Sequence, residues 1–279
     1  RTVGSIPVAN ATEEDISRFM VGRDVILKMN KKPAEFGDTL LKVTDLTYEN
    51  KEGRKLLDHV SFSLKKGQIL GIAGVEGNGQ NELAEAIFGF YSGVKGSILF
   101  DGKEILGKSI RAIRDDGISY IPEDRIKTGA AGNISLWGNM IADIIDSPLL
   151  KKHGLLNYKN IHERADKLIS DFGVLCQNDD QPIGMLSGGN MQKVVLAREF
   201  SLGADKLIIA QPTRGVDVGA KQDIYRLIDK LVRQGVSVIM VSSELPEVLG
   251  LSDRVLVMHQ GHLVGNLKTA ETSEEEIMQ

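Results

Sequence analysis

The sequence has very little cysteine, few aromatic residues and no long hydrophobic run. Cys176 is the only cysteine, and aromatic residues make up 5% of the chain. One cysteine excludes an internal disulfide framework and fits a reducing compartment. No apolar run reaches the roughly 18 residues of a membrane span, and no secretory signal is present, so any membrane role must be peripheral and depend on a partner. A net charge of only −4, without a basic stripe, gives no reason to expect nucleic acid as a partner.

The remaining composition is that of an ordinary globular protein. Hydrophobic residues make up 42% of the 279 residues and charged residues 26%. This length accommodates one large domain or two modest ones. Because the chain begins with Arg1 rather than Met, we expect a processed form or a fragment.

The two ends of the chain resemble each other. Residues 1–16 can be laid on residues 262–277, and both stretches read as a strand, a spacer and a Thr or Ser cap before an acidic helical turn. Chance similarity is the alternative. The economical interpretation is a parent protein with two tandem units. Residues 1–22 would then be the tail of the first unit, 23–39 a linker and 40–279 the second unit.

Hydrophobic patterning predicts alternating strands and helices. Residues 40–48 alternate and predict an edge strand, whereas Ile69–Ala73 is apolar throughout and predicts a strand buried on both faces. Helical spacing predicts that residues 133–172 are mostly helical. Further strands are expected at 60–64, 96–101, 118–121, 207–209, 237–241, 254–258 and 263–267, and further helices at 83–88, 108–114, 191–200 and 218–232.

A glycine-rich stretch, Gly74-Val75-Glu76-Gly77-Asn78-Gly79-Gln80-Asn81, lies between a predicted strand and a predicted helix. That is the context of a phosphate-binding loop. Its glycines fit Gly-x-x-x-x-Gly-Lys-Ser/Thr, but Gln80 replaces the Lys and Asn81 replaces the Ser or Thr. The cation and the usual Mg²⁺ hydroxyl are therefore missing. A structural turn and a weakened nucleotide site both remain open.

A second small-residue turn, Leu186-Ser187-Gly188-Gly189-Asn190, leads into the predicted helix at 191–200. The simplest interpretation is a helix N-terminus with Ser187 as the cap. The positive end of the helix dipole would favour an anion at the same place.

This Leu-Ser-Gly-Gly-Asn run resembles the signature motif of ABC transporter ATPases, and the other motif positions follow in that family's order. The resemblance implies a P-loop NTPase ABC cassette of the α/β class. Such a cassette has a mostly parallel core sheet, an antiparallel β edge and an α-helical subdomain, here at about residues 126–190. Its signature acts in trans, on a nucleotide held by a partner cassette.

The resemblance also implies which residues hold ATP and Mg²⁺. Tyr48 stands where the family stacks the adenine ring, although an exposed strand-end tyrosine is the alternative. Glu123 stands at the position of a Gln that reaches the metal and senses the membrane partner, with a charged strand end as the alternative. Asn81 and Glu123 are weak candidates for Mg²⁺ ligands. The expected nucleotide-binding set is Tyr48, Gly74, Gly77, Asn78, Gly79, Gln80, Asn81, Glu82, Glu123, Ser187, Gly188, Gly189 and Asp217.

The positions that would perform the chemistry are substituted. Ala210 and Gln211 stand where the family has Asp and Glu, and Ser243 stands where it has the switch His. Ala210 has no oxygen for a metal, and Gln211 can orient water but cannot accept its proton. No residue of this chain is therefore assigned a catalytic role. Our hypothesis is that this cassette's own site hydrolyses no ATP at a useful rate, while its signature completes the site of the first cassette.

Three stretches resemble the second cassettes of ribose, galactose or nucleoside importers: Pro122-Glu123-Asp124-Arg125, residues 213–218 and residues 243–248. The resemblance implies ATP-driven import of a simple sugar or nucleoside. The expected partners are the first cassette of the same chain, transmembrane permease subunits and, indirectly, a periplasmic or lipoprotein binding protein. The expected location is the cytoplasmic face of the membrane. The alternatives are a soluble tandem-cassette ATPase of the translation type and a non-hydrolysing regulatory nucleotide-binding module.

Overall fold

The computed structural model describes residues 5, 7, 36–152, 154–201 and 206–278. Most of the predicted tail (1–22) and linker (23–39), and with them the first copy of the repeat, lie outside these residues. The second copy, at 262–277, follows the predicted plan: a strand, a short 3₁₀ turn, and a final helix whose Glu276 N–H donates to Ser273 Oγ at 3.3 Å. None of the described helices has the length and apolar character that a membrane span requires.

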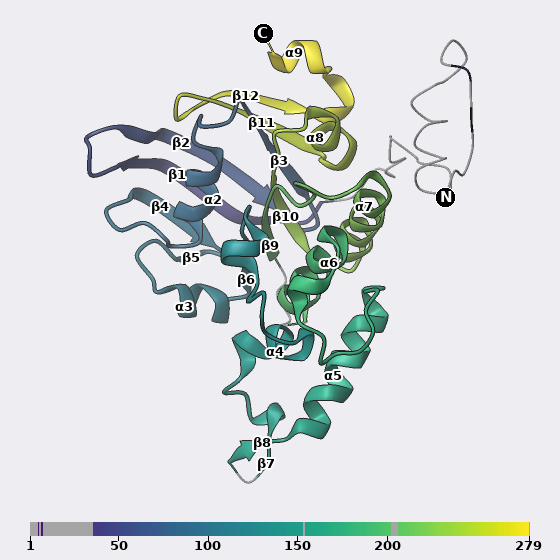
Figure 1. Ribbon diagram of the computed structural model, residues 1–279. Helices are drawn as coiled ribbons and strands as arrows, with labels where there is room; N and C mark the ends of the chain where they lie inside the picture. Colours follow the sequence, from purple (N-terminus) through teal and green to yellow (C-terminus); the bar gives the residue numbers. More distant parts are fainter. Residues whose placement is uncertain (1–4, 6, 8–35, 153, 202–205, 279) are drawn as a thin grey trace.

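A six-stranded sheet forms the centre of the molecule (Figure 1). Its order is β12-β11-β3-β10-β9-β6, and every neighbouring pair except β11–β12 is parallel. The register places Val241 beside Ile72 and Ala210, so the strands' carboxyl ends meet at one edge. This is the edge at which open α/β sheets bind ligands. The strands are β3 (Ile69–Ala73), β6 (Ile118–Ile121), β9 (Lys206–Ala210), β10 (Ser237–Val241), β11 (Arg254–His259) and β12 (His262–Lys268).

A second, antiparallel sheet has the order β2-β1-β4-β5. The prediction of an edge strand at 40–48 is wrong, because β1 pairs with β2 on one side and with β4 on the other. Its alternation has a different cause: Leu41 and Val43 face the core, while Lys42 faces solvent. The strands are β1 (Thr39–Glu49), β2 (Lys55–Lys65), β4 (Lys95–Phe100) and β5 (Lys103–Glu104).

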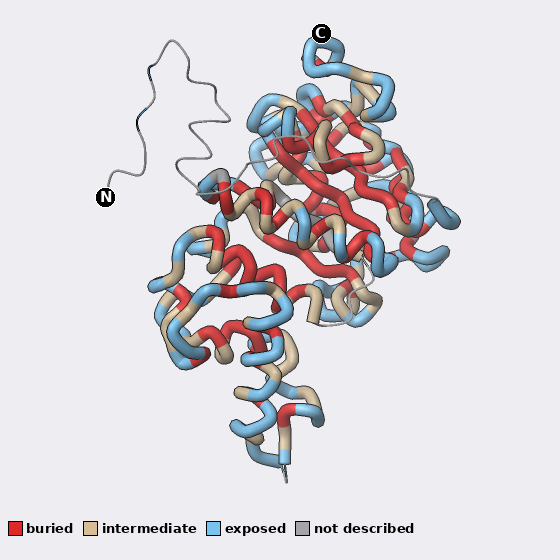
Figure 2. The backbone as a smooth tube through the Cα atoms, turned by 90° about the vertical axis from the view of Figure 1, so that its right-hand side faces the viewer, coloured by how far each residue is buried: buried red, intermediate tan, exposed pale blue. Residues whose placement is uncertain are grey.

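Both faces of the six-stranded sheet are covered, as Figure 2 shows by the buried strands at the centre. Successive residues of β3 point to opposite faces. Leu70 and Ile72 pack towards α2 and the antiparallel sheet, and Ile69 and Ala73 towards the helices on the other side. The prediction of a strand buried on both faces is therefore confirmed. The surrounding helices are α2 (Gln80–Ile87), α3 (Ile110–Asp115), α6 (Gly188–Phe200), α7 (Val218–Arg233), α8 (Leu245–Leu251) and α9 (Glu274–Met278).

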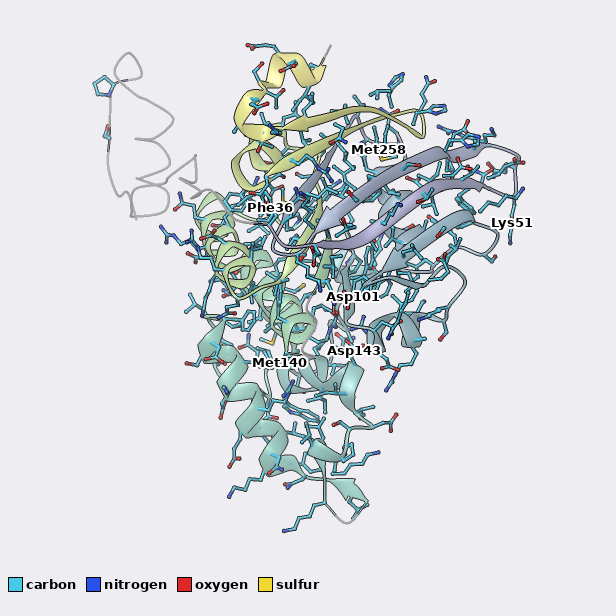
Figure 3. All side chains as sticks on the ribbon, turned by 180° about the vertical axis from the view of Figure 1, so that it is seen from behind. Phe36, Lys51, Asp101, Met140, Asp143 and Met258 are labelled. Carbon is cyan, nitrogen blue, oxygen red and sulfur yellow. The ribbon has the colours of Figure 1, made fainter. Side chains whose placement is uncertain are left out.

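Helices α4 (Leu136–Ile141) and α5 (Tyr158–Asp171) pack on α6 at the end of the molecule away from the antiparallel sheet (Figures 1 and 3). In Figure 3, Met140 and Asp143 lie towards this end and Lys51 at the tip of the β1–β2 hairpin. The prediction that 133–172 is mostly helical is only partly confirmed. Between the two helices lie 3₁₀ turns and a hairpin of β7 (Lys151–Lys152) and β8 (Leu155–Leu156), where Pro148 and Gly154 interrupt helical structure.

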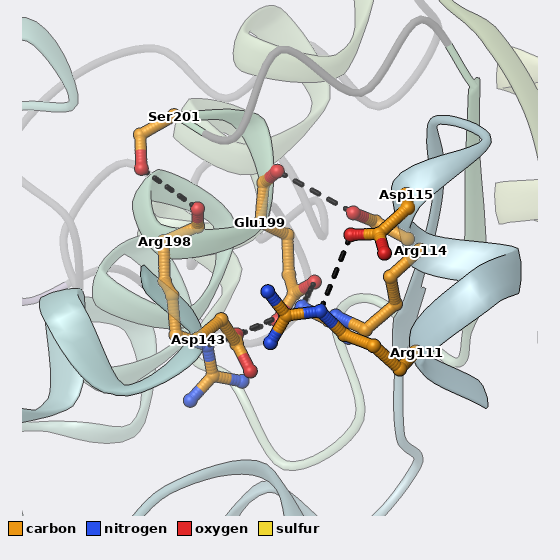
Figure 4. Close-up of polar contacts among 8 residues, drawn as sticks. Arg111, Arg114, Asp115, Asp143, Arg198, Glu199 and Ser201 are labelled. Carbon is orange, nitrogen blue, oxygen red and sulfur yellow. Dashed lines mark hydrogen bonds and ion pairs between the residues drawn. The ribbon is translucent and has the colours of Figure 1, made fainter. Parts of the chain in front are cut away.

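An ionic cluster fixes the carboxyl end of α6 (Figure 4). Glu199 is fully buried, and its two carboxylate oxygens accept from Arg114 Nη2 of α3 and from Arg198 Nε, each at 2.9 Å. Asp143 lies 2.8 Å from Arg114 Nη2 and 3.3 Å from Arg198 Nε. The helix that begins at the signature-like turn is thus tied at its other end to α3 and to the segment that follows α4.

Candidate functional site

The loop of residues 74–79 joins β3 to α2 at the ligand edge of the sheet. Gly79 has φ 104°, and a Cβ there would lie 2.7 Å from the Leu56 carbonyl oxygen, so only glycine fits. Asn78 ties the loop to the β11–β12 turn: its Oδ1 accepts from Gln260 N, and its backbone oxygen accepts from Gly261 N, each at 3.0 Å. The predicted strand–glycine loop–helix unit is confirmed.

Gln80 begins α2 and turns its side chain back into the loop. It is 6% exposed, and its Nε2 donates to the Val75 carbonyl oxygen at 3.0 Å. A Cβ on Gly74 would lie only 2.5 Å from that nitrogen, which shows how closely the amide fits inside the turn. A phosphate entering the loop would meet a neutral amide in place of an ammonium group.

Asn81 and Glu123, the weak candidates for Mg²⁺ ligands, are in direct contact. Asn81 Nδ2 donates to Glu123 Oε2 at 2.5 Å, and Glu123 Oε1 forms an ion pair with Arg214. Among the described residues, Asn81 Oδ1 is buried without a hydrogen-bond partner. One neutral oxygen and one carboxylate already paired with a guanidinium do not match the oxygen-rich, partly hydrated shell of Mg²⁺. In this arrangement the pair does not fit the metal.

A pocket of about 210 Å³ brings together residues that are far apart in the sequence. Part of its lining was not predicted, namely Glu76, Val241 and Ser242. The rest consists of predicted site residues from the glycine loop, the start of α2 and the segments after β9 and β10. They are Gly74, Gly77, Gln80, Asn81, Glu82, Gln211 and Ser243. A larger, mostly apolar pocket of about 730 Å³ adjoins the same loop, and its lining includes Val75, Met258 and Ile277.

Glu247 of α8 joins the loops that follow β9 and β10, next to Ser242 in the lining of the 210 Å³ pocket. Its carboxylate accepts from Thr213 Oγ1 at 2.6 Å and from Ser242 Oγ at 2.5 Å, and all three residues are at most 5% exposed. Burial raises the pKa of Glu247, against the opposing effect of its two hydroxyl donors. The sequence indicates no role for Glu247, because its partners come from separate segments and leave no signal in sequence spacing.

Tyr48 lies on β1 with its ring stacked on Tyr91, at 4.4 Å between centroids and 18° between planes. Tyr91 in turn donates from its hydroxyl to Glu85. Tyr48 is not among the described residues that line either pocket at the loop. Adenine stacking on Tyr48 stays a prediction, and it would require the ring face away from Tyr91.

The signature-like turn has the predicted capping geometry. Ser187 is the N-cap of α6, and its Oγ accepts from Asn190 N at 3.4 Å and from Asn190 Nδ2 at 3.0 Å. Gly189 packs on α7, since a Cβ there would lie 2.4 Å from Ala220 Cβ. Asp217 caps α7 by accepting from Ala220 N at 3.0 Å. The turn and Asp217 do not line the pocket at the glycine loop.

Arg125 is the last residue of the Pro-Glu-Asp-Arg run, and the sequence indicates no role for it. It donates from Nη1 to the Arg214 carbonyl oxygen and, at 3.0 Å, from Nη2 to that of Gly215. A Cβ on Gly188 would lie 2.7 Å from the same Nη2. The Pro-Glu-Asp-Arg run, the loop after β9 and the signature-like turn therefore meet at one guanidinium.

Another group of ligand-type side chains lies far from the loop in sequence. His162, Asp179 and Asp180 have potential metal-binding atoms within 4.8 Å of one another. His162 Nδ1 lies 2.5 Å from Asp179, and Trp137 Nε1 donates to Asp180 at 2.9 Å. These contacts tie α5 and Trp137 of α4 to the segment before the signature-like turn, so a packing role accounts for the cluster.

Comparison with known proteins places this geometry in a family. The family model described as "ABC transporter" matches residues 57–214, more than half of the chain. Among solved structures, a nucleotide-free ATP-binding cassette from an ABC transporter superposes with a TM-score of 0.73 at 26% identity, covering 86% of this chain and 94% of that one. The fold is also shared with cbiO1 of Clostridium perfringens, at a TM-score of 0.71 and 24% identity, covering 86% of this chain and 93% of that one.

Curated relatives match nearly the entire chain. A xylose import ATP-binding protein, XylG of Photobacterium profundum, is 40% identical over 279 residues, which are 99% of this chain and 55% of the relative. A ribose import ATP-binding protein, RbsA of Clostridium tetani, is 39% identical over 280 residues, which are 99% of this chain and 54% of the relative. The chain thus spans about half the length of these relatives. By its matched motifs and its fold, the chain belongs to the ABC transporter family of ATP-binding cassettes.

Proposed function

We propose that this chain is the second, degenerate cassette of a tandem-cassette ATPase that drives import of a simple sugar or nucleoside. Relatives whose names specify xylose and ribose import favour a sugar. The near-complete match to about half of each relative, with the resemblance between residues 1–16 and 262–277, supports two tandem cassettes. Residues 1–22 are then the tail of the first cassette, 23–39 the linker and 40–279 the second cassette, with its helical subdomain at about 126–190.

The observation that carries the proposal is the state of the pocket at the glycine loop. Gln80 is bonded to its own loop, and the Asn81–Glu123 pair is engaged with Arg214. Electrostatic stabilisation supplies most of the rate of phosphoryl transfer, and here the loop lysine and the catalytic carboxylates are replaced by neutral groups. This pocket therefore contributes little hydrolysis.

ATP and Mg²⁺ are assigned to a composite site. The first cassette supplies the Lys, Ser or Thr, Asp, Glu and His positions that this chain lacks. Ser187, Gly188 and Gly189 then face the γ-phosphate from the second cassette, at the amino end of α6. The intact protein binds permease subunits at the cytoplasmic face of the membrane and acts indirectly with a substrate-binding protein.

Hydrolysis by the chain alone and by the intact parent protein tests the proposal. We expect phosphate release by the intact protein and at least 100-fold less per cassette from residues 1–279, because only the composite site is complete. Hydrolysis by the isolated chain that Gln80→Ala or Gln211→Ala abolishes would contradict this. A first cassette that also lacks the Lys, the Ser or Thr, the Asp, the Glu and the His would contradict the proposal as well.

The two alternatives predict different measurements. A regulatory nucleotide-binding module would bind ATP tightly by itself, which calorimetry on the isolated chain detects. A soluble ATPase of the translation type should have a long charged linker between its cassettes, whereas the connector expected here is short.

A further inference from the structure

Arg125 contacts three segments that carry the family's motifs. It begins a five-residue π-helical turn, Arg125–Gly129, directly after Asp124. Its two terminal nitrogens donate to the consecutive carbonyl oxygens of Arg214 and Gly215, in the loop between β9 and α7. The same guanidinium packs on Gly188, the first residue of α6.

Gly188 fits this site because it lacks a side chain. A Cβ at 188 would lie 2.7 Å from Arg125 Nη2 and 3.1 Å from the Gly215 oxygen. The first glycine of the signature-like turn is therefore in contact with both the donor and the acceptor of one hydrogen bond. The turn and the loop before α7 are thus joined through the Arg125 guanidinium.

We propose that Arg125 is a positioning residue for the signature: it holds Gly188 against the 214–215 carbonyls so that the turn meets a nucleotide bound by the partner cassette. The inference rests on the function proposed above. Arginine suits this task because its planar fork donates to two acceptors at once, whereas a lysine ammonium is a point charge on a flexible stem. Arg125 itself does not touch the nucleotide in this scheme.

The test uses the intact parent protein assembled with its membrane subunits. Arg125→Ala, Arg125→Lys and the reference variant Ser187→Arg are compared for kcat, KM for ATP and melting temperature. Lys127→Ala is the matched control, since Lys127 lies in the same π-helical turn, is 83% exposed and pairs only with Asp124 at 3.8 Å among the described residues.

We expect Arg125→Ala to lower kcat about 10- to 100-fold, because a misplacement of about 1 Å costs about 100-fold in an oriented site. KM should stay close to that of Lys127→Ala, because the first cassette still holds the nucleotide. The melting temperature should fall slightly, because two hydrogen bonds to carbonyl oxygens are lost. The kcat of Arg125→Lys should lie between those of Arg125→Ala and the wild type, because the lysine restores one donor. A purely structural role would lower the melting temperature and leave kcat per folded molecule unchanged.

The outcomes separate this inference from the proposed function. If Ser187→Arg abolishes turnover while Arg125→Ala behaves like Lys127→Ala, the positioning role is wrong and the composite site stands. If Ser187→Arg also leaves turnover intact, the proposed function fails first.

If Arg125→Ala does not fold, Gly188→Ala and the double variant Gly188→Ala with Arg125→Lys decide the matter. The methyl group added by Gly188→Ala collides with the Arg125 guanidinium. Gly188→Ala should therefore lower kcat less in the Arg125→Lys background than in the wild type. Strictly multiplicative effects of the two substitutions would overturn the inference.

Discussion

The glycine loop before α2 and the signature turn before α6 have the same local design and opposite surroundings. Each is a turn of small residues that opens a helix at its positive end. At the glycine loop, three glutamates, Glu76, Glu82 and Glu123, lie around or beside the pocket together with one arginine, Arg214. At the signature turn the adjoining charged group is the guanidinium of Arg125. The two turns therefore differ in the charge that their neighbouring side chains present to a phosphate, although each opens a helix at its positive end.

The largest effect is expected at the signature turn. Ser187→Arg in the intact protein should lower ATP turnover about 1,000-fold, because it replaces the capping serine with a long cationic side chain at the place where the proposed function puts the γ-phosphate. Steady-state phosphate release by the intact parent protein measures this.

Ser170→Arg is the control for Ser187→Arg, because Ser170 is exposed on α5 and lies outside the signature turn. It should leave turnover unchanged. If both variants lost turnover equally, the added charge would act on the whole group of helices α4, α5 and α6. The proposed functional difference between the glycine loop and the signature turn would then be unsupported.

The next effect concerns the other end of the signature helix. Glu199→Ala should lower the free energy of unfolding by about 3 kcal/mol, because two largely buried guanidinium groups, Arg114 and Arg198, lose a shared carboxylate and keep Asp143 as their carboxylate partner among the described residues. Chemical denaturation of the isolated chain measures the change.

Asp115→Ala is the matched control in the same region (Figure 4). Asp115 pairs with Arg111 at 3.2 Å, but both side chains are more than 60% exposed, so the expected loss is below about 0.5 kcal/mol. A similar loss for both variants would show that the buried cluster does not anchor α6.

Periodicity predicted most of the sheet and both helix-opening turns, because apolar runs such as Ile69–Ala73 and caps such as Ser187 are local features. It failed where the answer depends on distant partners. The alternation of β1 reports one buried face and cannot tell an edge strand from an inner one. Arg125 and Glu247 act through backbone oxygens and hydroxyls of remote loops, which no spacing rule encodes.

A smaller effect is expected at Glu247, under the glycine-loop pocket. Because burial raises its pKa in the folded protein, its protonated form stabilises the fold below the unfolded-state value of about 4.3, and that contribution is lost as pH rises through the raised value. Glu247→Gln stays neutral and can bond both hydroxyls, accepting from one with its amide oxygen and donating to the other from its amide nitrogen. The stability of Glu247→Gln relative to the wild type, and with it the melting temperature, should therefore increase with pH over this window.

Melting curves from pH 4 to 8 measure this difference, with Glu163→Gln on the exposed face of α5 as control. Turnover should stay within about twofold, since both hydroxyl contacts remain. If the melting temperatures of Glu247→Gln and the wild type changed in parallel with pH, the Glu247 carboxylate would be charged throughout this range. Burial would then not be the dominant influence on its pKa.

The smallest effect is expected for Gln80→Ala. Among the described residues its side chain hydrogen-bonds to its own loop, at the Val75 carbonyl oxygen, and it brings no charge to a phosphate. We expect turnover of the intact protein within about twofold of the wild type and a stability loss of about 1 kcal/mol from one hydrogen bond. Gln68→Ala is the matched control: Gln68 is also a buried glutamine, 5% exposed, and accepts from Lys65 N at 3.1 Å, away from both turns. If Gln80→Ala slows hydrolysis as strongly as Ser187→Arg while Gln68→Ala does not, the glycine-loop pocket takes part in chemistry after all, and the two turns are equivalent in function as well as in form.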